Sequence, residues 1–196
     1  VYAMNKMIKI PNEDLFTSIP DKKKINYNNE SFSTYIKTVE NDKLLDGNVA
    51  NFRHKSKEGG LDTIGFGHKL TEEENKNNMV YGYDLSEINS STSPERILEI
   101  SNDILRQDLE KAEKILTKNY GNKFINLDLR RKQMLIDFQF NGGAGMVTLF
   151  KKFRTAVFAG DEKTMKKEYI RSFKAANGTR KTLARNDFFK KYFLNK

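Results

Sequence analysis

A glycine-rich segment at residues 58–70, EGGLDTIGFGHKL, constrains the fold of this chain more than any other stretch. It contains four glycines and one of the two histidines among 196 residues. Glycine adopts positive φ angles without strain, so the letters KEGG predict a turn at residues 57–60. The flanking segments 48–56 and 61–67 have strand-like patterns, and residues 68–71 are compatible with a short third strand. We therefore predict a small antiparallel sheet in this region.

A helical pattern precedes the sheet. The apolar side chains that recur there at the spacing of a buried helical face are Phe32, Tyr35, Ile36 and Val39. Ser31 is a candidate N-cap for this helix. Glu40 follows eight residues after Phe32 and continues the apolar stripe, which is an unusual place for a carboxylate.

Further helical patterns follow the sheet. The letters SPE at residues 93–95 combine a cap, a proline and an acid, and they predict a long helix over about 93–118. An apolar helix is expected at residues 127–140, followed by an Asn-Gly-Gly stop. Residues 71–91 have the composition of a polar loop. Shorter helices are expected at 148–158, 161–173 and 182–193, and the letters KAANGTR separate the last two.

The order of these elements predicts the domain organisation. Sheet and helices are segregated along the chain, which is typical of an α+β fold. We expect an extended N-terminal arm at residues 1–28 and one domain at 29–196. Within it we expect an N-terminal α/β lobe at 29–92, the linking helix, and a C-terminal helical lobe at 119–196.

Composition narrows the possible functions. The chain has no cysteine, which excludes a disulfide framework and a cysteine nucleophile. With only two histidines, we expect no metal site and no cofactor. The net charge of +9 favours an anionic partner, and nucleic acid, acidic lipid and bacterial cell wall all qualify. No apolar run is long enough for a transmembrane helix, so we expect no stable membrane insertion, and the first ten residues lack the apolar region of a secretory signal.

Position alone gives Glu40 two interpretations. It is either a helix-end carboxylate with a basic partner or a general acid. A carboxyl group against an apolar face is desolvated and keeps its proton more readily, which is the property that a glycosidase acid needs.

Together, Glu40 and the letters TIGFGH at residues 63–68 resemble the phage T4-type lysozymes, or glycoside hydrolase family 24. In that family a glutamate ends the first helix, and a TIG-x-GH motif forms the second strand of a hairpin. Two later segments, QMLIDFQFNGGAG at 133–145 and LARNDFF at 183–189, are similar to the family's central helix and final basic segment. The resemblance implies a lysozyme-like fold, in which a β-hairpin lobe and a mostly helical lobe are joined by a long helix.

The resemblance also implies an activity and residue roles. The expected reaction is hydrolysis of the β-1,4 bond between N-acetylmuramic acid and N-acetylglucosamine in peptidoglycan. Glu40 would protonate the leaving oxygen, and the Thr63 hydroxyl would hold a water on the far face of the sugar. Arg185 would pair with Glu40, while Asn141 and Phe140 would support the substrate side of the site.

The second catalytic group is where this chain departs from the family. The usual spacing is Glu, eight residues, Asp, five residues, Thr. Counting forward from Glu40 leads to Val49, and counting back from Thr63 leads to Lys57. Neither side chain activates a water at neutral pH. His54 is one candidate replacement, although an exposed strand residue is the simpler interpretation of it.

Two acids, Glu58 and Asp62, are the other candidates for this role. Neighbours on a strand face opposite sides, so Asp62 points away from the substrate if Thr63 points toward it. Asp62 would then pair with His68 or Lys69. Glu58 lies in the predicted turn, and we favour it as the second carboxylate. Whether the outcome is inverting, retaining or lyase-type depends on this choice.

The remaining motif residues have structural interpretations. His68 is expected to be structural and bound to an acid. Gly65 and Gly67 are expected to allow close packing where the sheet meets the helices. The segments KKFRTAVF and NDFFKKYF combine basic and aromatic residues as nucleic-acid-binding elements do, but a core-facing aromatic stripe explains them more simply.

We therefore expect a bacteriolytic muramidase whose partner is bacterial peptidoglycan and not nucleic acid. It would be monomeric unless it belongs to a virion assembly. Its location would be the host cytoplasm with release to the periplasm and cell wall at lysis, as for a free endolysin, or the virion. The alternative is a non-catalytic or altered lysozyme-like domain that binds the cell wall or builds the virion.

Overall fold

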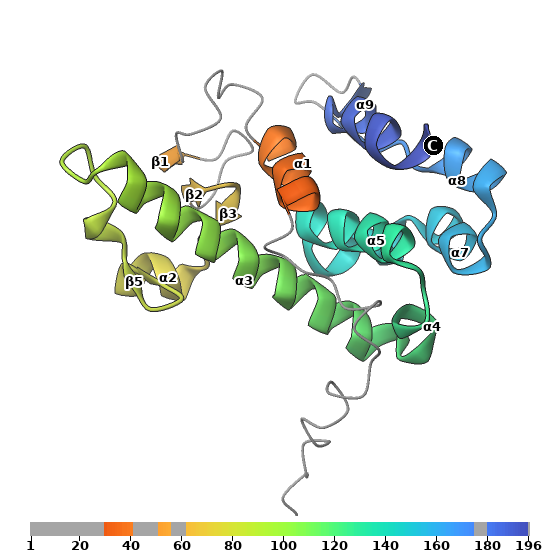
Figure 1. Ribbon diagram of the computed structural model, residues 1–196, viewed down its shortest axis with the longest axis horizontal. Helices are drawn as coiled ribbons and strands as arrows, with labels where there is room; N and C mark the ends of the chain where they lie inside the picture. The colour runs from red at the N-terminus through yellow and green to blue at the C-terminus, as the bar shows by residue number, and fades with distance from the viewer. Residues whose placement is uncertain (1–29, 41–50, 56–61, 175–179, 196) are drawn as a thin grey trace, which may run out of the picture.

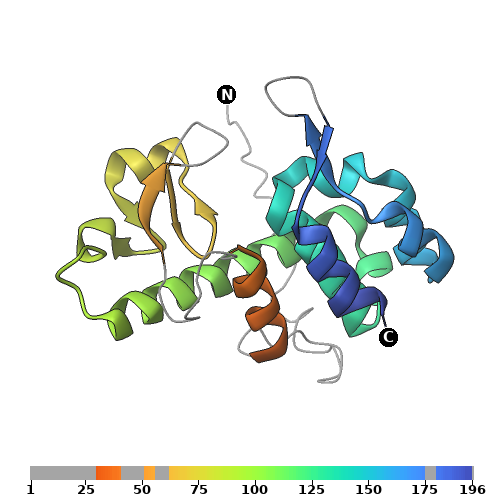
Figure 2. The ribbon, with the colours of Figure 1, turned by 90° about the horizontal axis from the view of Figure 1, so that it is seen from above.

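The computed structural model describes residues 30–40, 51–55, 62–174 and 180–195. The predicted N-terminal arm and the predicted turn at residues 57–60 lie outside these ranges. Figures 1 and 2 show a small sheet-containing part and a larger helical part, with the long helix α3 (Pro94–Tyr120) running through both. The first helix, α1 (Glu30–Glu40), lies between the two parts.

The predicted sheet is confirmed. Its strands are antiparallel, with β2 in the centre, and they are β1 (Asn51–Lys55), β2 (Asp62–Gly65) and β3 (His68–Lys69). The register places Thr63 opposite His54 on one side and Lys69 on the other. Ile64 is fully buried, which anchors the sheet against the long helix.

The predicted polar loop at residues 71–91 is wrong, because this stretch forms short regular elements. They are α2 (Glu72–Asn77), β4 (Met79–Val80), β5 (Tyr83–Asp84) and the 3-10 turn η3 (Leu85–Glu87). α2 buries no side chain, so it has no apolar periodicity to detect. It is instead started by a capping box, in which Thr71 and Glu74 satisfy each other's backbone N–H groups.

The predicted long helix is confirmed. The Ser93 hydroxyl accepts a hydrogen bond from the Arg96 N–H at 3.2 Å, which caps the helix as expected. One face of α3 is buried along its length, by Ile97, Ile100, Ser101, Ile104, Leu105, Leu109, Ala112 and Leu116. This face packs against both α5 (Leu129–Gly142) and β2, so α3 forms the common support of the two parts.

The helical part contains more and shorter elements than predicted. Besides α5 they are α4 (Asn122–Ile125), the 3-10 turn η4 (Gly143–Gly145), α6 (Met146–Leu149), α7 (Lys151–Ala159), α8 (Glu162–Glu168), β6 (Ser172–Lys174), β7 (Arg180–Thr182), α9 (Arg185–Phe189) and the π-helical segment η5 (Lys190–Leu194). The predicted helix at 148–158 is therefore two helices, broken at Phe150.

The predicted helices at 161–173 and 182–193 are wrong at their facing ends. α8 ends at Glu168, and residues 172–174 pair with residues 180–182 as an antiparallel hairpin. The cause lies at Arg171, whose backbone N–H and C=O both bond the side-chain amide of Asn186, at 2.9 and 2.7 Å. Because both backbone groups of Arg171 bond Asn186, they are not used in the hydrogen bonds of a helix, and the chain becomes extended after this residue.

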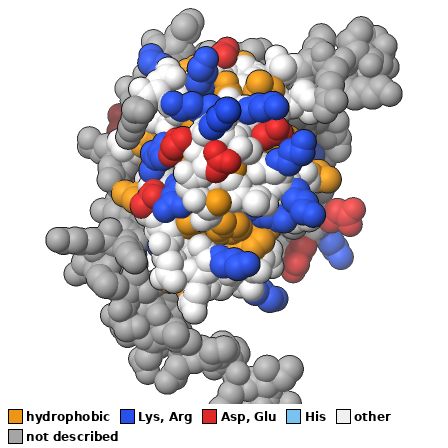
Figure 3. Space-filling model, turned by 90° about the vertical axis from the view of Figure 1, so that its right-hand side faces the viewer, with side chains coloured by type: hydrophobic (Ala, Val, Ile, Leu, Met, Phe, Trp, Pro, Cys, Tyr) orange, Lys and Arg blue, Asp and Glu red, His pale blue; other side chains and the backbone are white. Residues whose placement is uncertain are grey.

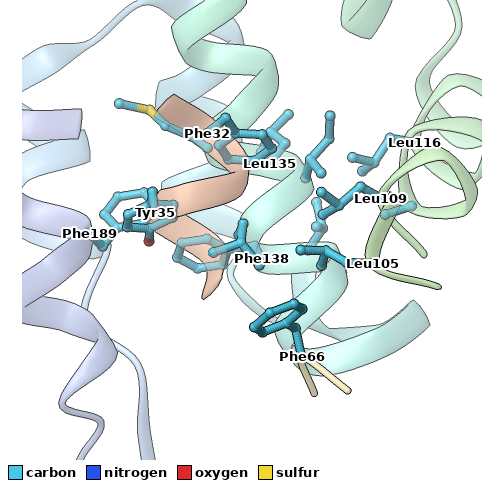
Figure 4. Packing of buried hydrophobic residues seen from close by; sticks show 14 of the residues in the cluster. Phe32, Tyr35, Phe66, Leu105, Leu109, Leu116, Leu135, Phe138 and Phe189 are labelled. Atoms are coloured by element: carbon cyan, nitrogen blue, oxygen red, sulfur yellow. The ribbon is translucent and has the colours of Figure 1, made fainter. Parts of the chain in front are cut away.

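α1 packs against the end of the chain. Phe32 and Tyr35 contact Phe193 of η5, with ring centroids 6.4 and 5.2 Å apart. Figure 4 shows the same face of α1 beside Phe138 and Phe189. Ser31, the predicted cap, is instead the second residue of the helix, and its hydroxyl lies 3.0 Å from that of Tyr192.

The aromatic residues of NDFFKKYF serve the core, as predicted. Phe189 and Phe193 are fully buried, and Phe188 and Tyr192 pack partly buried against them. In KKFRTAVF, Phe153 is buried as well. Over the described residues the architecture is therefore mostly helical with small antiparallel hairpins, an α+β arrangement. No helix within these ranges combines the length and the hydropathy needed to cross a bilayer.

Candidate active site

Glu40 lies at the C-terminal end of α1, where its side chain is 19% exposed. Its Oε1 accepts a hydrogen bond from Nη1 of Arg185, at the start of α9. The two residues are 145 positions apart in the sequence, so the fold brings them together. The predicted contact between Arg185 and Glu40 is confirmed.

Gly67 lies directly against the other oxygen of the Glu40 carboxyl group, Oε2. A Cβ atom at this position would lie 2.6 Å from Glu40 Oε2 and 3.0 Å from its Cδ. The φ angle of Gly67 is +91°, a backbone conformation that residues with a Cβ atom rarely adopt. Gly65 packs against α3, where a Cβ would lie at an ordinary contact distance of 3.4 Å from the Ser101 side chain. The predicted close packing at both glycines is confirmed.

Asp137 of α5 is the other partner of Arg185. Its Oδ1 accepts hydrogen bonds from Nε and Nη2 of Arg185, at 3.2 and 2.6 Å. The Tyr35 hydroxyl donates to the same oxygen at 3.1 Å. Asp137 is fully buried, so one guanidinium group is shared between a buried carboxylate and the partly exposed Glu40.

Arg171 completes a chain of alternating charges. Its Nη1 lies 2.8 Å from Oδ2 of Asp137, and it donates to Oδ1 of Asn141 at 3.3 Å. The guanidinium group also lies over the ring of Phe138, 4.2 Å from the centroid, a position that favours a cation. Arg171 is 1% exposed, so the order Glu40, Arg185, Asp137, Arg171 leads from the surface into the core.

The charges of this network support one another. Burial alone would raise the pKa of Asp137, but the positive charges of Arg185 and Arg171 hold it below its ordinary value. Burial would lower the pKa of Arg185, whereas Asp137 and Glu40 raise it. Burial and the charge of Asp137 raise the pKa of the Tyr35 hydroxyl, so Tyr35 stays a neutral donor. The two arginines therefore favour the ionised form of Asp137 in the folded protein.

Sequence reasoning misses Asp137 and Arg171. The available signal for Asp137 is a single carboxylate inside the apolar letters LIDF, because such a group is buried only with a partner. Arg171 offers no comparable signal, since it lies in a segment with many basic residues.

The supporting residues Asn141 and Phe140 both lie beside the network. Asn141 accepts the hydrogen bond from Arg171 already described and is half-buried. The ring of half-buried Phe140 lies 6.0 Å from the guanidinium carbon of Arg185. Phe140 and Asn141 therefore come after Asp137 in the last turns of α5, where both side chains lie next to the two arginines.

Thr63 and Asp62 lie side by side on β2. Thr63 is half-buried and precedes Gly67 by four residues. Asp62 Oδ2 accepts a hydrogen bond from Nε of Arg53 at 2.7 Å, and Arg53 also donates to Asn75 and Asn78. The predicted pairing of Asp62 with His68 or Lys69 is wrong, because Arg53 lies on the neighbouring strand and reaches Asp62 directly. The carboxylate of Asp62 therefore points toward α2 and its C-terminal cap.

The two other candidates for the second catalytic group lie outside the described residues. Glu58 belongs to the range 56–61, and only the backbone of His54 is described, opposite Thr63. The choice between them stays a prediction.

His68 has the structural environment that the sequence predicts. Its Nδ1 lies 2.9 Å from Oδ2 of Asp108 on α3, and its Nε2 lies 3.2 Å from Oε2 of Glu74 on α2. Tyr81 donates to Asp108 at 2.7 Å, and the His68 side chain is only 7% exposed. Burial alone would lower the pKa of His68, but the hydrogen bonds and charges of Asp108 and Glu74 raise it.

In the described part of the chain, no group of three or more His, Cys, Asp or Glu side chains is arranged to hold a metal ion. The candidate site consists instead of a carboxyl group, a guanidinium group and a close glycine. Comparison with protein-family models, with curated proteins and with solved structures found no match to this chain.

Proposed function

We propose that the protein is a muramidase of the phage T4 lysozyme type, which hydrolyses the β-1,4 bond between N-acetylmuramic acid and N-acetylglucosamine. The observation that carries this proposal is the meeting of three segments at one carboxyl group. Glu40 ends the first helix, Gly67 belongs to the TIGFGH letters, and Arg185 belongs to the final basic segment. The resemblance singles out these segments from sequence alone, and they lie far apart along the chain.

The roles follow from the chemistry of each group. Glu40, partly exposed, protonates the leaving glycosidic oxygen. Arg185 fixes the orientation of that carboxyl group through a charge-assisted hydrogen bond. Thr63 holds the water that attacks the sugar from the other face, and Glu58 activates this water. Asp62 is less suited to that role, because it is engaged by Arg53.

The lysozyme-like architecture is part of the same proposal. A small sheet and a helical bundle joined by a 27-residue helix support it, since a polysaccharide chain would bind between two such parts. We further propose that the enzyme acts on bacterial peptidoglycan as a free endolysin or as part of a virion. Its excess positive charge favours this anionic target.

The test is the substitution Glu40→Gln, which keeps the size of the side chain and removes the acid. Removing a general acid costs on the order of 100-fold or more in rate, so clearing of a peptidoglycan suspension and release of reducing ends should both fall by at least about that factor. Glu73→Gln is the matched control, because it neutralises an exposed glutamate on α2, and it should retain full activity.

The opposite result also has a clear meaning. Wild-type protein that binds purified sacculi but releases no reducing ends would refute the proposal. It would assign the chain to the non-catalytic class of lysozyme-like cell-wall-binding or virion domains.

A further inference from the structure

Asp137 has no part in the mechanism proposed above, yet it is the most completely buried member of the charge network. We propose that Asp137 is a positioning residue, which divides the guanidinium group of Arg185 between two carboxylates and thereby reduces the positive charge that acts on Glu40. The catalytic consequence rests on the proposed function. The effect on Glu40 itself rests only on the geometry of the network.

The hydrogen bonds of Arg185 are divided unequally between its two partners. Arg185 directs Nε and Nη2 to Asp137 and only Nη1 to Glu40. Arg185 is 6% exposed, so the bonds to Asp137 are shielded from water and hold the guanidinium plane in place. Because that plane is fixed, Nη1 reaches one oxygen of Glu40 and leaves its Oε2 beside Gly67.

The charges of the network are balanced only while Asp137 is ionised. With Glu40 ionised, the network contains two carboxylates and two guanidinium groups, and its net charge is zero. When Glu40 takes up a proton, Asp137 still neutralises one of the two arginines. If Asp137 were neutral, Glu40 would face both positive charges alone, and these would favour its ionised form.

The other groups around Glu40 do not replace this effect. On α1, the ammonium group of Lys37 lies 5.3 Å from the centre of the Phe66 ring, one turn before Glu40, and as a cation it supplies no negative charge. Tyr35, also on α1, stays neutral because its pKa is raised. Arg171 faces the network from beyond Asp137. Among these described groups, the carboxylate of Asp137 supplies the compensating negative charge.

A purely structural ion pair is the simpler explanation, since buried arginines need a partner wherever they occur. The two explanations differ in one measurable quantity, the pH at which Glu40 loses its proton. A structural role leaves this pH unchanged in a folded variant. The positioning role moves it, and the direction is fixed by the sign of the charge that is removed.

The decisive experiment is a titration of the Glu40 carboxyl carbon by NMR in full-length wild-type protein and in Asp137→Asn. Asparagine keeps the shape of the side chain but not its charge. We expect the titration midpoint of Glu40 to fall by about one pH unit, as for a carboxyl group beside an uncompensated cation. In the peptidoglycan assay, the alkaline limb of the pH–activity profile should move down with it, and kcat should fall while KM stays unchanged.

Asp187→Asn is the matched control, since Asp187 is an exposed carboxylate on α9, two residues from Arg185. It removes the same charge, from the helix that carries Arg185, and should leave both midpoints where they are. An unchanged or higher Glu40 midpoint in folded Asp137→Asn overturns the proposal. If the protein lyses no peptidoglycan at all, the NMR titration still decides the role of Asp137, and only the proposed function fails.

Tyr35→Phe keeps the test decisive if Asp137→Asn does not fold. It removes a hydrogen-bond donor from Asp137 without removing the ring that packs in the core. Less of the negative charge of Asp137 is then neutralised, so the Glu40 midpoint should move slightly upward, opposite to Asp137→Asn. A downward shift, or none, in this variant overturns the proposal.

Discussion

At the scale of single residues, Gly67 shows how backbone and site depend on each other. Its positive φ angle turns the chain between β2 and β3, and its missing side chain makes room for the carboxyl group of Glu40. The atoms that a Cβ would strike belong to the flexible end of Glu40, which can move aside. The overlap between a new Cβ at position 67 and Glu40 would therefore cost little stability, but it would displace the candidate acid.

We predict that Gly67→Ala separates stability from activity. A non-glycine residue at positive φ costs about 1 kcal/mol or more in unfolding free energy, measured by urea denaturation. Displacement of Glu40 should in addition lower peptidoglycan hydrolysis by about tenfold or more, because small misplacements of reacting groups are costly. Gly82→Ala is the control, since Gly82 has a φ of +88° and nothing within 4 Å of its Cβ position. It should lose similar stability and no activity; equal activity in both variants would contradict the prediction.

The sequence predicts one half of the charge network and not the other. Glu40 and Arg185 are predictable because motif order relates them to each other. Asp137 and Arg171 are not, because the energy of a buried charge depends on a partner from a distant segment, here 34 residues away. A pattern within one helix contains no information about that partner.

At the scale of elements, His68 fastens the sheet to its neighbours. It comes from β3, bonds Asp108 on α3 and Glu74 on α2, and so connects three elements through one ring. Glu74 is also the N3 residue of the capping box of α2. The start of that helix and its attachment to the sheet therefore depend on the same carboxylate.

We predict that this connection weakens at alkaline pH. Because the pKa of His68 is raised in the folded protein, its charged form adds stability that is fully present below about pH 6.5, the ordinary value. This stability is lost as the pH rises through the folded pKa, and each pH unit between the unfolded and folded pKa values corresponds to about 1.4 kcal/mol. Urea unfolding of wild type and His68→Gln between about pH 5 and pH 9 measures it. A stability difference that does not shrink toward high pH would be inconsistent with a charged His68.

Helices and strands are predictable where their side chains follow a period, and not elsewhere. α3 has a cap and a long apolar face, so its predicted limits lie close to the observed ones. α2 is polar on all sides and is recognised only by its capping box. The hairpin of β6 and β7 is predicted wrongly as helix ends, although Asn177 and Gly178 between the strands are a strong hairpin signal.

At the scale of the whole molecule, positive charge is spread over the helical part. Figure 3 shows Lys and Arg side chains over the face formed by the end of this part, interspersed with fewer acids. Exposed lysines on α7, α8 and η5 contribute to it, namely Lys151, Lys152, Lys163, Lys166, Lys167, Lys190 and Lys191. Exposed charges attract an anionic polymer over a distance that salt shortens.

We therefore predict that binding to purified sacculi depends strongly on ionic strength. The Glu40→Gln protein should lose about tenfold or more in affinity between about 0.05 M and 0.5 M NaCl, measured by co-sedimentation. Replacing Lys166 and Lys167 together by Gln should reduce both the affinity at low salt and its salt dependence. Binding that is insensitive to salt would show that recognition depends on neutral sugar contacts instead.

The ion pair between α1 and α9 also has a consequence for the order of folding events during synthesis. Translation makes Glu40 early and Arg185 145 residues later, so a chain still attached to the ribosome holds the acid long before its partner exists. Closing so long a loop also places this contact among the slower events of folding. The pairing that orients Glu40 can therefore form only after the 145 positions that separate it from Arg185 have been synthesised.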